Sequence, residues 1–521
     1  MTNPQSGILA WLASPATYGV APGGVERIDT HISAVFLVGK RVFKLKRAVQ
    51  LPFLDFTSLE SRKRACDREL AINRRTAPDL YLGLSAITRQ PDGRLAFDGP
   101  GEVVDWLVVM ARFGQDGLFD RMAARDQLTR HHARDLADAV ARLHRAAELR
   151  PDWGGEAGLR FTIESNAATL NRFVPGLFDA TAVDDLTDRS RAWLARLAPL
   201  LEQRRSGGSV RLCHGDLHLG NICLFHGQPT LFDAIEFNDD FACIDVFYDL
   251  AFLIMDLDVR GLSNLASAVF NRYLERTGDF GAVAALPLFL SLRAAIRAHV
   301  AAATFTGTGE ARHRDGAHVY LGKAAAYLSP VTPRLLAVGG LSGTGKSRLS
   351  ADLAPLLGRA PGAVVLRSDV LRKQLMGVDP EQRLPPEAYG ADVTEQTYRR
   401  LCDLAADLLQ AGHAVVADAV FARPEQRQAV AAVASARGVR FDGLWLEAPA
   451  HLLRARVSGR RHDASDATAS VLDQQLTYSL GEIDWPRLDT SATKRTVAGR
   501  ARQVLGLDGA ISQSTTVPPA S

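Results

Sequence analysis

The most constraining feature of this chain is the run Gly-Gly-Leu-Ser-Gly-Thr-Gly-Lys-Ser at residues 339–347, which contains the pattern GxxxxGK[ST] from Gly340 to Ser347. An apolar segment, residues 335–338, comes directly before it. A strand that leads into a glycine-rich turn and then a helix can close its backbone N–H groups around phosphate oxygens, because glycine permits the required backbone angles and a helix N-terminus is positively polarised. The sequence therefore predicts a phosphate-binding loop at the end of a strand.

The residue types of this loop predict how it would hold a nucleotide. Lys346 is placed to reach the β- and γ-phosphates, and the Ser347 hydroxyl is placed to ligate Mg²⁺. We therefore expect ATP and Mg²⁺ as cofactors, and we expect the whole loop to contact the phosphates through Gly340, Gly343, Thr344, Gly345, Lys346 and Ser347.

Strands and helices alternate after this loop. We predict strands at 335–338, 363–367, 414–417 and 440–445, separated by helices that begin near Gly345, Val370 and Pro424. Such alternation favours a parallel, doubly wound sheet. Asp369 and Asp418 follow the second and third of these strands, and ligands bind at the carboxyl edge of such sheets. We therefore expect both carboxylates beside the phosphate loop.

This segment resembles the small P-loop kinases of the gluconate-kinase, chloramphenicol-phosphotransferase and zeta-toxin type, which are AAA-type ATP-binding proteins. The resemblance covers about residues 333–507 and includes the basic residues that follow Asp369. It implies that Asp369 accepts or orients the proton of an acceptor hydroxyl and that Asp418 is a partner of Mg²⁺. It also implies a lid in which Arg456 and Arg460 close over the transferring phosphate.

A second motif, His-Gly-Asp-Leu-His-Leu-Gly-Asn, lies upstream at residues 214–221. Asp216 and Asn221 are five positions apart on one tight loop, so a carboxylate can meet an acceptor hydroxyl while an amide oxygen holds Mg²⁺. Asp233 follows a predicted strand at 230–232, where a second carboxylate can bridge the metal and the outer phosphates. The three residues together predict a phosphotransfer site.

These residues resemble the aminoglycoside phosphotransferase family, which has the two-lobed protein-kinase-like fold and carries HGDxHxxN followed by an Asp-bearing strand. The resemblance spans roughly residues 20–328. It implies that Asp216 is the catalytic base or the group that orients the hydroxyl, and that Asn221 and Asp233 are metal ligands. Glu236 would be a further ligand or a structural partner.

The phosphate-anchoring lysine of such a fold should lie on a strand of the first lobe. Lysine is rare in this chain, with eight residues, and an ammonium fits between phosphate oxygens better than a planar guanidinium does. Lys44 and Lys46 point to the same face of a predicted strand, because side chains alternate along a strand. Lys44 is our first choice and Lys46 our second, with Glu69 on the next helix as the ion-pair partner. No GxGxxG loop precedes this strand, which departs from the kinase pattern.

The predicted fold class is an α/β multi-domain protein: a two-lobed, protein-kinase-like α+β domain followed by a P-loop NTPase domain with a parallel, doubly wound sheet. The first domain would cover residues 1–328, with a small lobe at about 20–110 and a large lobe at about 111–328. Two prolines predict an extended linker at 329–333. The P-loop kinase domain would cover 334–508, and the Ser, Thr and Pro of 509–521 predict a disordered tail.

Composition narrows the choice of partners. Sixty-one basic and 58 acidic residues leave a net charge of +3 without a long run of one sign, which argues against a nucleic-acid or anionic-membrane partner. Residues 1–22 lack the pattern of a signal peptide, and we find no run of about 18 apolar residues. The five cysteines lack the spacing of a zinc site. We therefore expect a cytoplasmic protein with reduced thiols.

The leading interpretation is a bifunctional ATP-dependent phosphotransferase in which each domain transfers a γ-phosphoryl group to a hydroxyl of a small molecule. Two alternatives stay open for the P-loop half. It could be a regulatory ATPase or nucleotide sensor, or a polynucleotide 5′-hydroxyl kinase, although no basic and aromatic stripe supports the latter. The sequence does not identify either acceptor or the oligomeric state.

Overall fold

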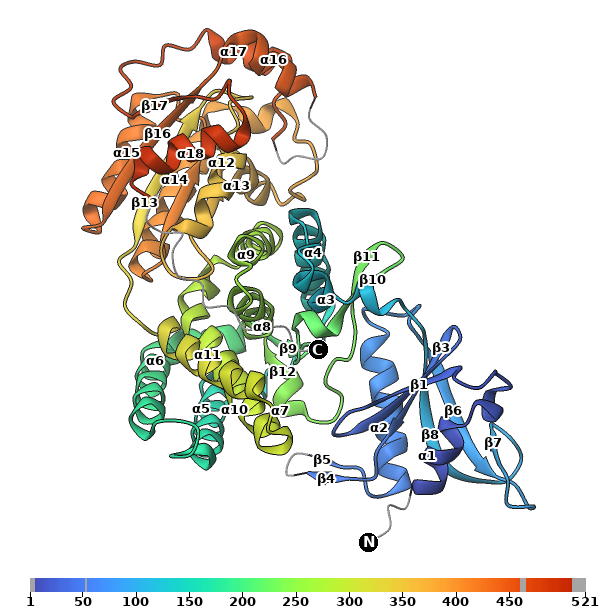
Figure 1. The fold of residues 1–521 in the computed structure, drawn as a ribbon. Helices are drawn as coiled ribbons and strands as arrows, with labels where there is room; N and C mark the ends of the chain where they lie inside the picture. Colours follow the sequence, from blue (N-terminus) through green and yellow to red (C-terminus); the bar gives the residue numbers. More distant parts are fainter. Residues whose placement is uncertain (1–4, 52–53, 460–464, 508–521) are drawn as a thin grey trace. The chain divides into compact units, whose positions relative to one another are not determined.

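The computed structural model of this chain describes residues 5–51, 54–459 and 465–507 (Figure 1). The chain forms two compact units. The first contains residues up to Phe161 together with Ala198–Leu253, and the second contains Thr162–Leu197 together with the residues from Ile254 onward. The predicted linker lies inside the second unit, so the domain boundaries stay a prediction. The predicted tail at 509–521 lies outside the described residues.

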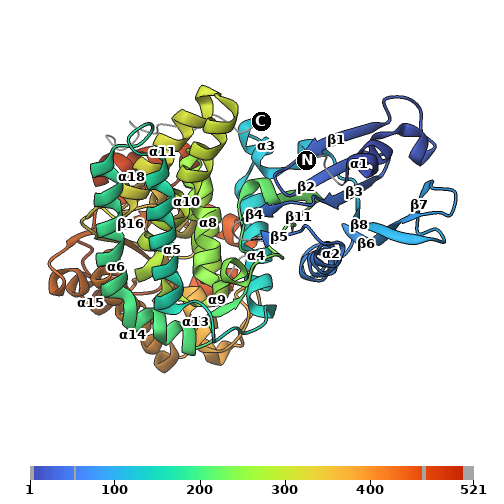
Figure 2. The same cartoon turned by 90° about the horizontal axis from the view of Figure 1, so that it is seen from below.

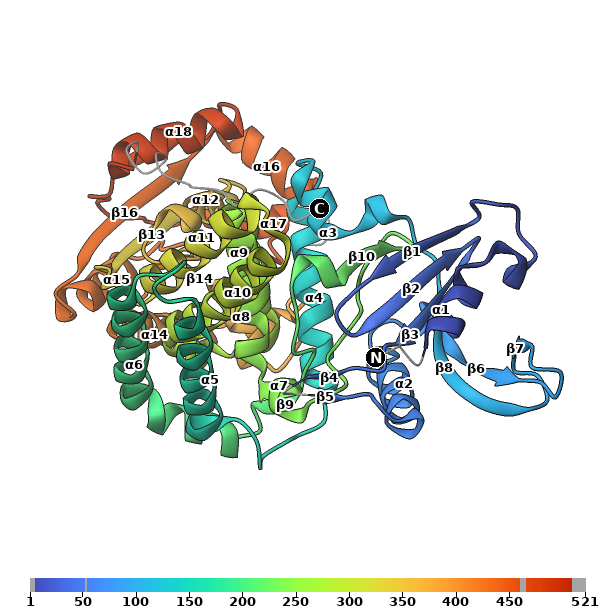
Figure 3. The same cartoon turned by 60° about the horizontal axis from the view of Figure 1, so that its bottom comes forward.

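A six-stranded antiparallel sheet forms the centre of the first unit, with the strand order β1-β2-β3-β8-β6-β7 (Figure 3). The sequence pattern also predicts strands at 25–28, at 33–46 with a turn near Gly39, and at 103–110, and these are confirmed. The strands of this sheet are β1 (Val25–Asp29), β2 (Ser33–Val38), β3 (Arg41–Lys46), β6 (Tyr81–Arg89), β7 (Leu95–Phe97) and β8 (Glu102–Ala111).

Alternation along β3 gives this sheet two different faces. Phe43 and Leu45 pack in one apolar cluster with residues of helix α1 (Ser6–Ala13). Val42 points the other way and packs in a second cluster with Cys66 of helix α2 (Leu59–Asn73). Because side chains alternate in a strand, residues 44 and 46 share the face that α2 covers.

The run Thr57-Ser58-Leu59-Glu60 predicts a capping box at the start of α2, but the observed N-cap lies one residue later. Ser58 is the N-cap, and its hydroxyl accepts the N–H of Ser61 at 3.0 Å. The cap satisfies one of the N–H groups that a helix start leaves unpaired. The predicted helix itself, with Glu69 in its third turn, is confirmed.

The rest of the first unit carries the HGD motif between short strands. β10 and β11 form an antiparallel hairpin, and β9 pairs with β12. The strand predicted at 230–232 ends earlier, at Leu231, and Asp233 follows in the left-handed conformation with φ 60°. These elements are η1 (Pro15–Tyr18), β4 (Gln50–Leu51), β5 (Leu54–Asp55), η2 (Gln115–Gly117), α3 (Phe119–Ala124), α4 (Arg130–Ala146), β9 (Val210–Leu212), η4 (Leu219–Asn221), β10 (Ile222–Phe225), β11 (Gln228–Leu231), α7 (Asp239–Ala242) and β12 (Cys243–Asp245).

Three helices contribute residues to both units, and several more belong to the second unit. In the second unit α5 and α6 run side by side and are joined by the Arg191–Glu164 ion pair (Figure 2). Phe280–Thr308 is long and apolar enough to cross a membrane, but 78% of its most apolar window is buried inside the protein. The helices are α5 (Gly155–Leu170), η3 (Asn171–Phe173), α6 (Ala180–Ser206), α8 (Val246–Val259), α9 (Ser263–Thr277), η5 (Phe280–Ala285), α10 (Leu286–Thr308) and α11 (Ala311–Tyr327).

A five-stranded sheet with the order β14-β15-β13-β16-β17 lies in the second unit, and all its pairings are parallel. The predicted doubly wound, parallel arrangement is therefore confirmed. Residues 391–410, which we did not predict as helical, form α14. The elements are β13 (Arg334–Gly340), α12 (Lys346–Leu353), η6 (Ala354–Leu356), β14 (Val364–Arg367), α13 (Ser368–Leu375), η7 (Pro386–Tyr389), α14 (Ala391–Gln410), β15 (Val415–Asp418), α15 (Pro424–Ala436), β16 (Arg440–Glu447), α16 (Ala450–Ser458), α17 (Ala469–Leu476), β17 (Arg487–Asp489) and α18 (Lys494–Leu505).

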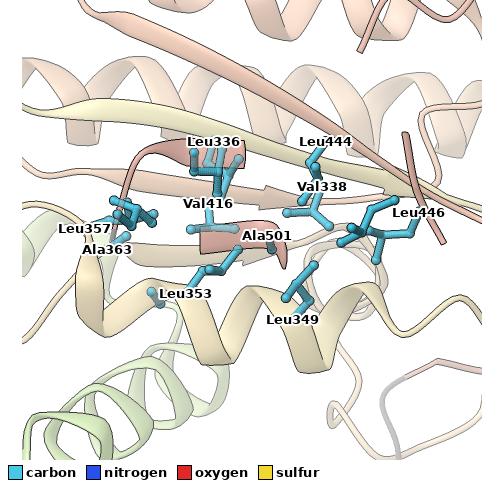
Figure 4. Packing of buried hydrophobic residues seen from close by; sticks show 14 of the residues in the cluster. Leu336, Val338, Leu349, Leu353, Leu357, Ala363, Val416, Leu444, Leu446 and Ala501 are labelled. Carbon is cyan, nitrogen blue, oxygen red and sulfur yellow. The ribbon is translucent and has the colours of Figure 1, made fainter. Parts of the chain in front are cut away.

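The helix that follows the phosphate loop is held against this sheet by an apolar core. Leu349 and Leu353 of α12 point toward Leu336 and Val338 of β13 (Figure 4). Val416, Leu444 and Leu446 from the neighbouring strands complete the cluster. Because the loop is bounded by β13 and α12, this packing fixes where its backbone lies.

Replacement of Leu353 by alanine should destabilise the second unit. The side chain is fully buried, so its removal leaves a cavity, and we expect a loss of about 2–5 kcal/mol in the free energy of unfolding. Urea denaturation would measure it. Val504→Ala, at a residue that is 47% exposed on α18, is the control, and an equal loss in both variants would contradict the packing described here.

Candidate active sites

Lys44 connects three segments of the first unit. Its Nζ lies 2.8 Å from Glu69 Oε1 on α2 and 2.5 Å from Asp233 Oδ1 after β11. The Lys44 side chain is 11% exposed and that of Asp233 is 43% exposed, so this end of the cluster opens to solvent. The predicted pairing of Lys44 with Glu69 is thus present, and the pair lies beside a predicted metal ligand.

Lys46 lies deeper in the same cluster. It pairs with Glu69 and with Glu236, and its side chain is 1% exposed. Lys44 is therefore the lysine that faces the open carboxylate, whereas Lys46 is enclosed by two acidic residues.

The charges in this cluster shift one another's protonation. Burial alone would raise the pKa of Glu69, but Lys44 and Lys46 outweigh it and lower that pKa to about 2. Burial alone would lower the pKa of Lys44, but Asp233 and Glu69 raise it well above its ordinary value. For Glu236 burial dominates, and its pKa is raised. The cluster therefore keeps both lysines charged and Glu69 ionised at neutral pH.

The HGD loop holds Asp216 and Asn221 together. Asn221 Nδ2 donates to Asp216 Oδ2 at 2.9 Å and to the Asp216 carbonyl at 3.0 Å. With its N–H groups used in this way, the Asn221 side chain has its oxygen left to accept a cation. His218 Nε2 lies 3.4 Å from Asp216 Oδ2, and His218 Nδ1 accepts the N–H of Gly220. The two residues that the motif places on one loop are thus in direct contact, which the spacing alone did not predict.

A buried carboxylate braces the start of this loop. Asp249 accepts the backbone N–H of His214 at 3.1 Å and that of Gly215 at 2.9 Å. It also contacts His144, and with Cys213 these three side chains approach closely enough to hold a metal. Because both Asp249 oxygens already accept backbone N–H groups, we interpret the cluster as a loop brace.

The segment that carries Asp233 is fixed to the HGD loop and to α2. The Phe232 N–H donates to the Asn221 carbonyl at 3.0 Å, and the Tyr81 hydroxyl contacts the Asp233 N–H at 3.2 Å. Asn73 of α2 accepts the N–H of Ala234 at 2.9 Å. These bonds hold Asp233 in a left-handed conformation that non-glycine residues rarely adopt.

The phosphate loop of the second unit has the backbone that its glycines predict. Gly340, Gly343 and Gly345 have φ of 138°, 88° and 93°. A Cβ at Gly340 would lie 2.5 Å from the Leu446 carbonyl oxygen, and one at Gly343 would lie 2.8 Å from that of Leu453. Only glycine fits these two positions without displacing the backbone.

Four of the predicted ligands lie together at the loop. Lys346 Nζ donates to the Leu341 carbonyl at 3.1 Å, so the side chain folds over the loop, and Thr344 bonds to the same carbonyl at 2.8 Å. The Ser347 hydroxyl bonds to Asp418, the last residue of β15.

Asp418 has the features of a cation ligand. It is buried, and within the described residues its Oδ2 has no hydrogen-bond partner. Arg367 Nε lies 3.7 Å from this oxygen. Burial raises the pKa of Asp418, although Arg367 and Lys346 oppose the shift. A buried carboxylate oxygen without a hydrogen-bond partner, next to a serine hydroxyl, can serve as a ligand of Mg²⁺, because Mg²⁺ prefers oxygen ligands.

We expected Asp369 at the end of a strand, and this expectation was wrong, because Asp369 lies in a helix. β14 ends at Arg367, and Asp369 is half-buried in the first turn of α13, because Ser368 already begins the helix. The helix then directs Arg372 onto the Tyr389 ring and the Ala388 carbonyl. The basic residues after Asp369 therefore organise residues 380–389 instead of projecting into solvent.

Residues 380–389 are held from a second side by an acidic residue. Asp466 accepts from Lys373 Nζ at 3.1 Å, from the Leu384 N–H at 3.0 Å and from the Tyr389 hydroxyl at 2.7 Å. Lys373 is fully buried and also donates to the Pro380 carbonyl. The sequence singled out neither Asp466 nor Tyr389, and their spacing carries no motif.

Of the two arginines predicted for the lid, only Arg456 lies within the described residues. Arg456 donates to Thr490 and, at 3.4 Å, to the carbonyl of Gly343 in the phosphate loop. It therefore lies beside the loop but its donors face protein oxygens. Arg460 lies outside the described residues.

Two family models match this chain. Residues 94–286 match that of the phosphotransferase enzyme family, and residues 335–479 match that of an AAA domain. A separate segment of the chain is thus similar to each of these two families. The predicted fold class and the predicted enzyme class, a phosphotransferase, are thereby confirmed.

Relatives and solved structures cover either the whole chain or one half. An uncharacterized protein of Mycobacterium tuberculosis is 28% identical over 487 residues, which cover 91% of this chain and 94% of the relative. A choline/ethanolamine kinase family protein from Mesorhizobium loti is 13% identical, covers 62% of this chain and 95% of its own, and has a TM-score of 0.39. A sugar kinase from Janibacter sp. HTCC2649 is 21% identical, covers 35% of this chain and 99% of its own, and has a TM-score of 0.26.

The loss of folding stability at acid pH should depend on Glu69. A carboxylate whose pKa falls from 4.5 to about 2 on folding adds stability above pH 4.5, and that stability is lost as the pH falls toward 2. Between pH 4.5 and about 2, the melting temperature of Glu69→Gln should therefore fall less than that of the wild type. Glu60→Gln, on the exposed face of the same helix, should follow the wild type. Parallel curves for Glu69→Gln and the wild type would contradict the assignment.

Proposed function

We propose that the chain is a bifunctional, ATP-dependent phosphotransferase, in which each domain transfers the γ-phosphoryl group of ATP to a hydroxyl of a small molecule. The same observation supports the proposal in both units: a lysine, a carboxylate and a second polar side chain lie close together. In the first unit these are Lys44, the partly exposed Asp233 and Asn221. In the second unit they are Lys346, Asp418, which among the described residues has an oxygen without a hydrogen-bond partner, and Ser347. Asn221 and Asp233 in the first unit, and Ser347 and Asp418 in the second, would hold Mg²⁺, which would supply positive charge to offset the charge that develops during transfer.

In the first unit, Lys44 would bind the α- and β-phosphates while Glu69 holds its ammonium in place. Asn221 and Asp233 would be the metal ligands, and Lys44 would have to leave Asp233 as the metal and nucleotide enter. Asp216 would orient the acceptor hydroxyl and take its proton as the new O–P bond forms and the bond to the β-phosphate oxygen breaks, which releases ADP. The Asn221 bond keeps the Asp216 carboxylate in one orientation.

In the second unit, the N–H groups of residues 340–347 would surround the phosphates, and Lys346 would exchange its bond with the Leu341 carbonyl for the outer phosphates. Ser347 and Asp418 would hold the metal. Asp369 would orient the acceptor hydroxyl, and the ordered segment at 380–389 would form one wall of the acceptor pocket. Arg456 would face the transferring phosphate only after leaving Thr490.

Asp216→Asn should remove one class of product. The amide keeps the shape of the side chain but cannot take a proton, so transfer by the first site should fall by about a hundredfold or more. The measurement is transfer of radiolabelled γ-phosphate from ATP to a panel of hydroxyl-bearing small molecules, with Asp184→Asn as an exposed control. Loss of every product, or of none, would contradict two independent sites.

Lys346→Ala should remove the other class of product, by about a hundredfold, because a charge aimed at the transferring group is lost. Lys494→Ala, at an exposed lysine of the same unit, should leave transfer unchanged. Lys346-dependent ATP hydrolysis without any phosphorylated small molecule would favour a regulatory ATPase instead. Labelling of an oligonucleotide 5′-hydroxyl would favour a polynucleotide kinase.

A further inference from the structure

Helix α9 lies against the P-loop part of the second unit. It packs against α12, the helix that follows the phosphate loop, and against η6. Gln374 of α13 donates to the carbonyls of Leu274 and Glu275 at the C-terminal end of α9. Yet α9 belongs by sequence to the stretch that matches the phosphotransferase family model, residues 94–286. A helix of one family segment is thus in contact with the loop helix of the other.

Asn271 of α9 takes the place of a neighbouring strand at the edge of the parallel sheet. β14 is an edge strand, so one side of it lacks a strand partner. Asn271 Oδ1 accepts the N–H of Val365 at 2.7 Å, and Asn271 Nδ2 donates to the Ala363 carbonyl at 3.2 Å. One amide side chain thereby satisfies both a donor and an acceptor of the exposed edge. This contact fixes β14, which ends two residues before Asp369.

A row of alternating charges runs from Asp418 across α9. Arg367 Nη1 lies 3.2 Å from Glu275 Oε1, while Arg367 Nε lies 3.7 Å from Asp418 Oδ2. The row continues on α9, where Glu275 pairs with Arg272 at 3.3 Å.

The same row reaches the segment that leads to residues 380–389. Arg272 lies 2.6 Å from Glu381, and Arg276 lies 2.7 Å from Asp379 and 3.2 Å from Glu381. Arg272 is 5% exposed and Glu275 is 14% exposed, so the inner members are screened little by water. The α9 charges therefore connect the proposed metal ligand of the second site with the segment proposed to bound its acceptor pocket.

We propose that α9 is part of the second active site and that Glu275 is a positioning residue, which acts on the metal ligand Asp418 through Arg367. This inference rests on the function proposed above for the second site. Glu275 and Asp418 share one guanidinium: Arg367 donates a hydrogen bond to Glu275 at 3.2 Å and lies 3.7 Å from Asp418. Removal of the Glu275 charge takes away one of the two carboxylates that share this guanidinium, so Arg367 is drawn more strongly to Asp418 and competes with the metal for the Asp418 oxygens.

The test compares nucleotide binding with and without metal on the full chain. Isothermal titration calorimetry measures the affinity for Mg·ADP and, separately, the affinity for metal-free ADP. The binding event that disappears in Lys346→Ala is assigned to the second site. Glu275→Gln should weaken Mg·ADP binding at that site by about tenfold, as removal of outer partners of metal ligands generally does, and should leave the metal-free ADP affinity unchanged. Glu425→Gln, an exposed glutamate at the start of α15, should change neither.

A purely structural role for α9 predicts another pattern. Glu275→Gln would then lower the melting temperature without changing the difference between the two affinities, and this result would overturn the proposal. If Glu275→Gln does not fold, Glu275→Asp keeps the charge but shortens its reach, and it should give a smaller loss in the same direction. Unchanged Mg·ADP affinity in a folded Glu275→Asp protein would also overturn it. If Lys346→Ala removes no isotherm, the proposed function of the second site fails instead.

Discussion

A charge that is removed from water needs a partner of opposite sign, and this constraint determines how both candidate sites are built. In the first unit the buried Glu69 carboxylate is tolerable only because Lys44 and Lys46 meet it from β3. The same requirement joins β3, α2 and the segment after β11, since each supplies one charge of the cluster. In the second unit the buried carboxylate of Asp418 is met by Ser347 and Arg367. Loss of one charge in either cluster would leave others unpaired, so fold and site are not separable there.

The scarcity of lysine gains a physical meaning from these clusters. Four of the eight lysines, Lys44, Lys46, Lys346 and Lys373, lie in the two candidate sites. Each of them donates within a space bounded by carboxylate or carbonyl oxygens, where a compact ammonium with rotatable donors fits and a planar guanidinium would need more room. Arginine takes the roles that need a broad fork, as in the Arg367 contact with two carboxylates.

The parts of this structure that could be predicted from sequence are those whose chemistry is local. The phosphate loop, the alternating strands around it and the placing of Asp216 and Asn221 on one loop depend on residues a few positions apart, and all were expected; the direct bond between Asp216 and Asn221 was not. The left-handed backbone at Asp233 was not, because bonds from Tyr81 and Asn73 impose it across a long sequence separation. Asp466 and the contact of α9 with β14 were missed for the same reason. Single polar residues carry no periodicity, and only the fold brings them to the site.

The edge of the parallel sheet explains why the compact units differ from the two family segments. β14 has a strand neighbour on one side only, so its other side needs donors and acceptors from elsewhere. Asn271 supplies them from α9, and the charges of Arg272, Glu275 and Arg276 continue this contact along the helix. Residues 254–286 therefore lie in one compact unit with the AAA domain although they match the phosphotransferase family model. A P-loop segment cut at the predicted linker would lose the residues that cover its edge strand and hold Arg367.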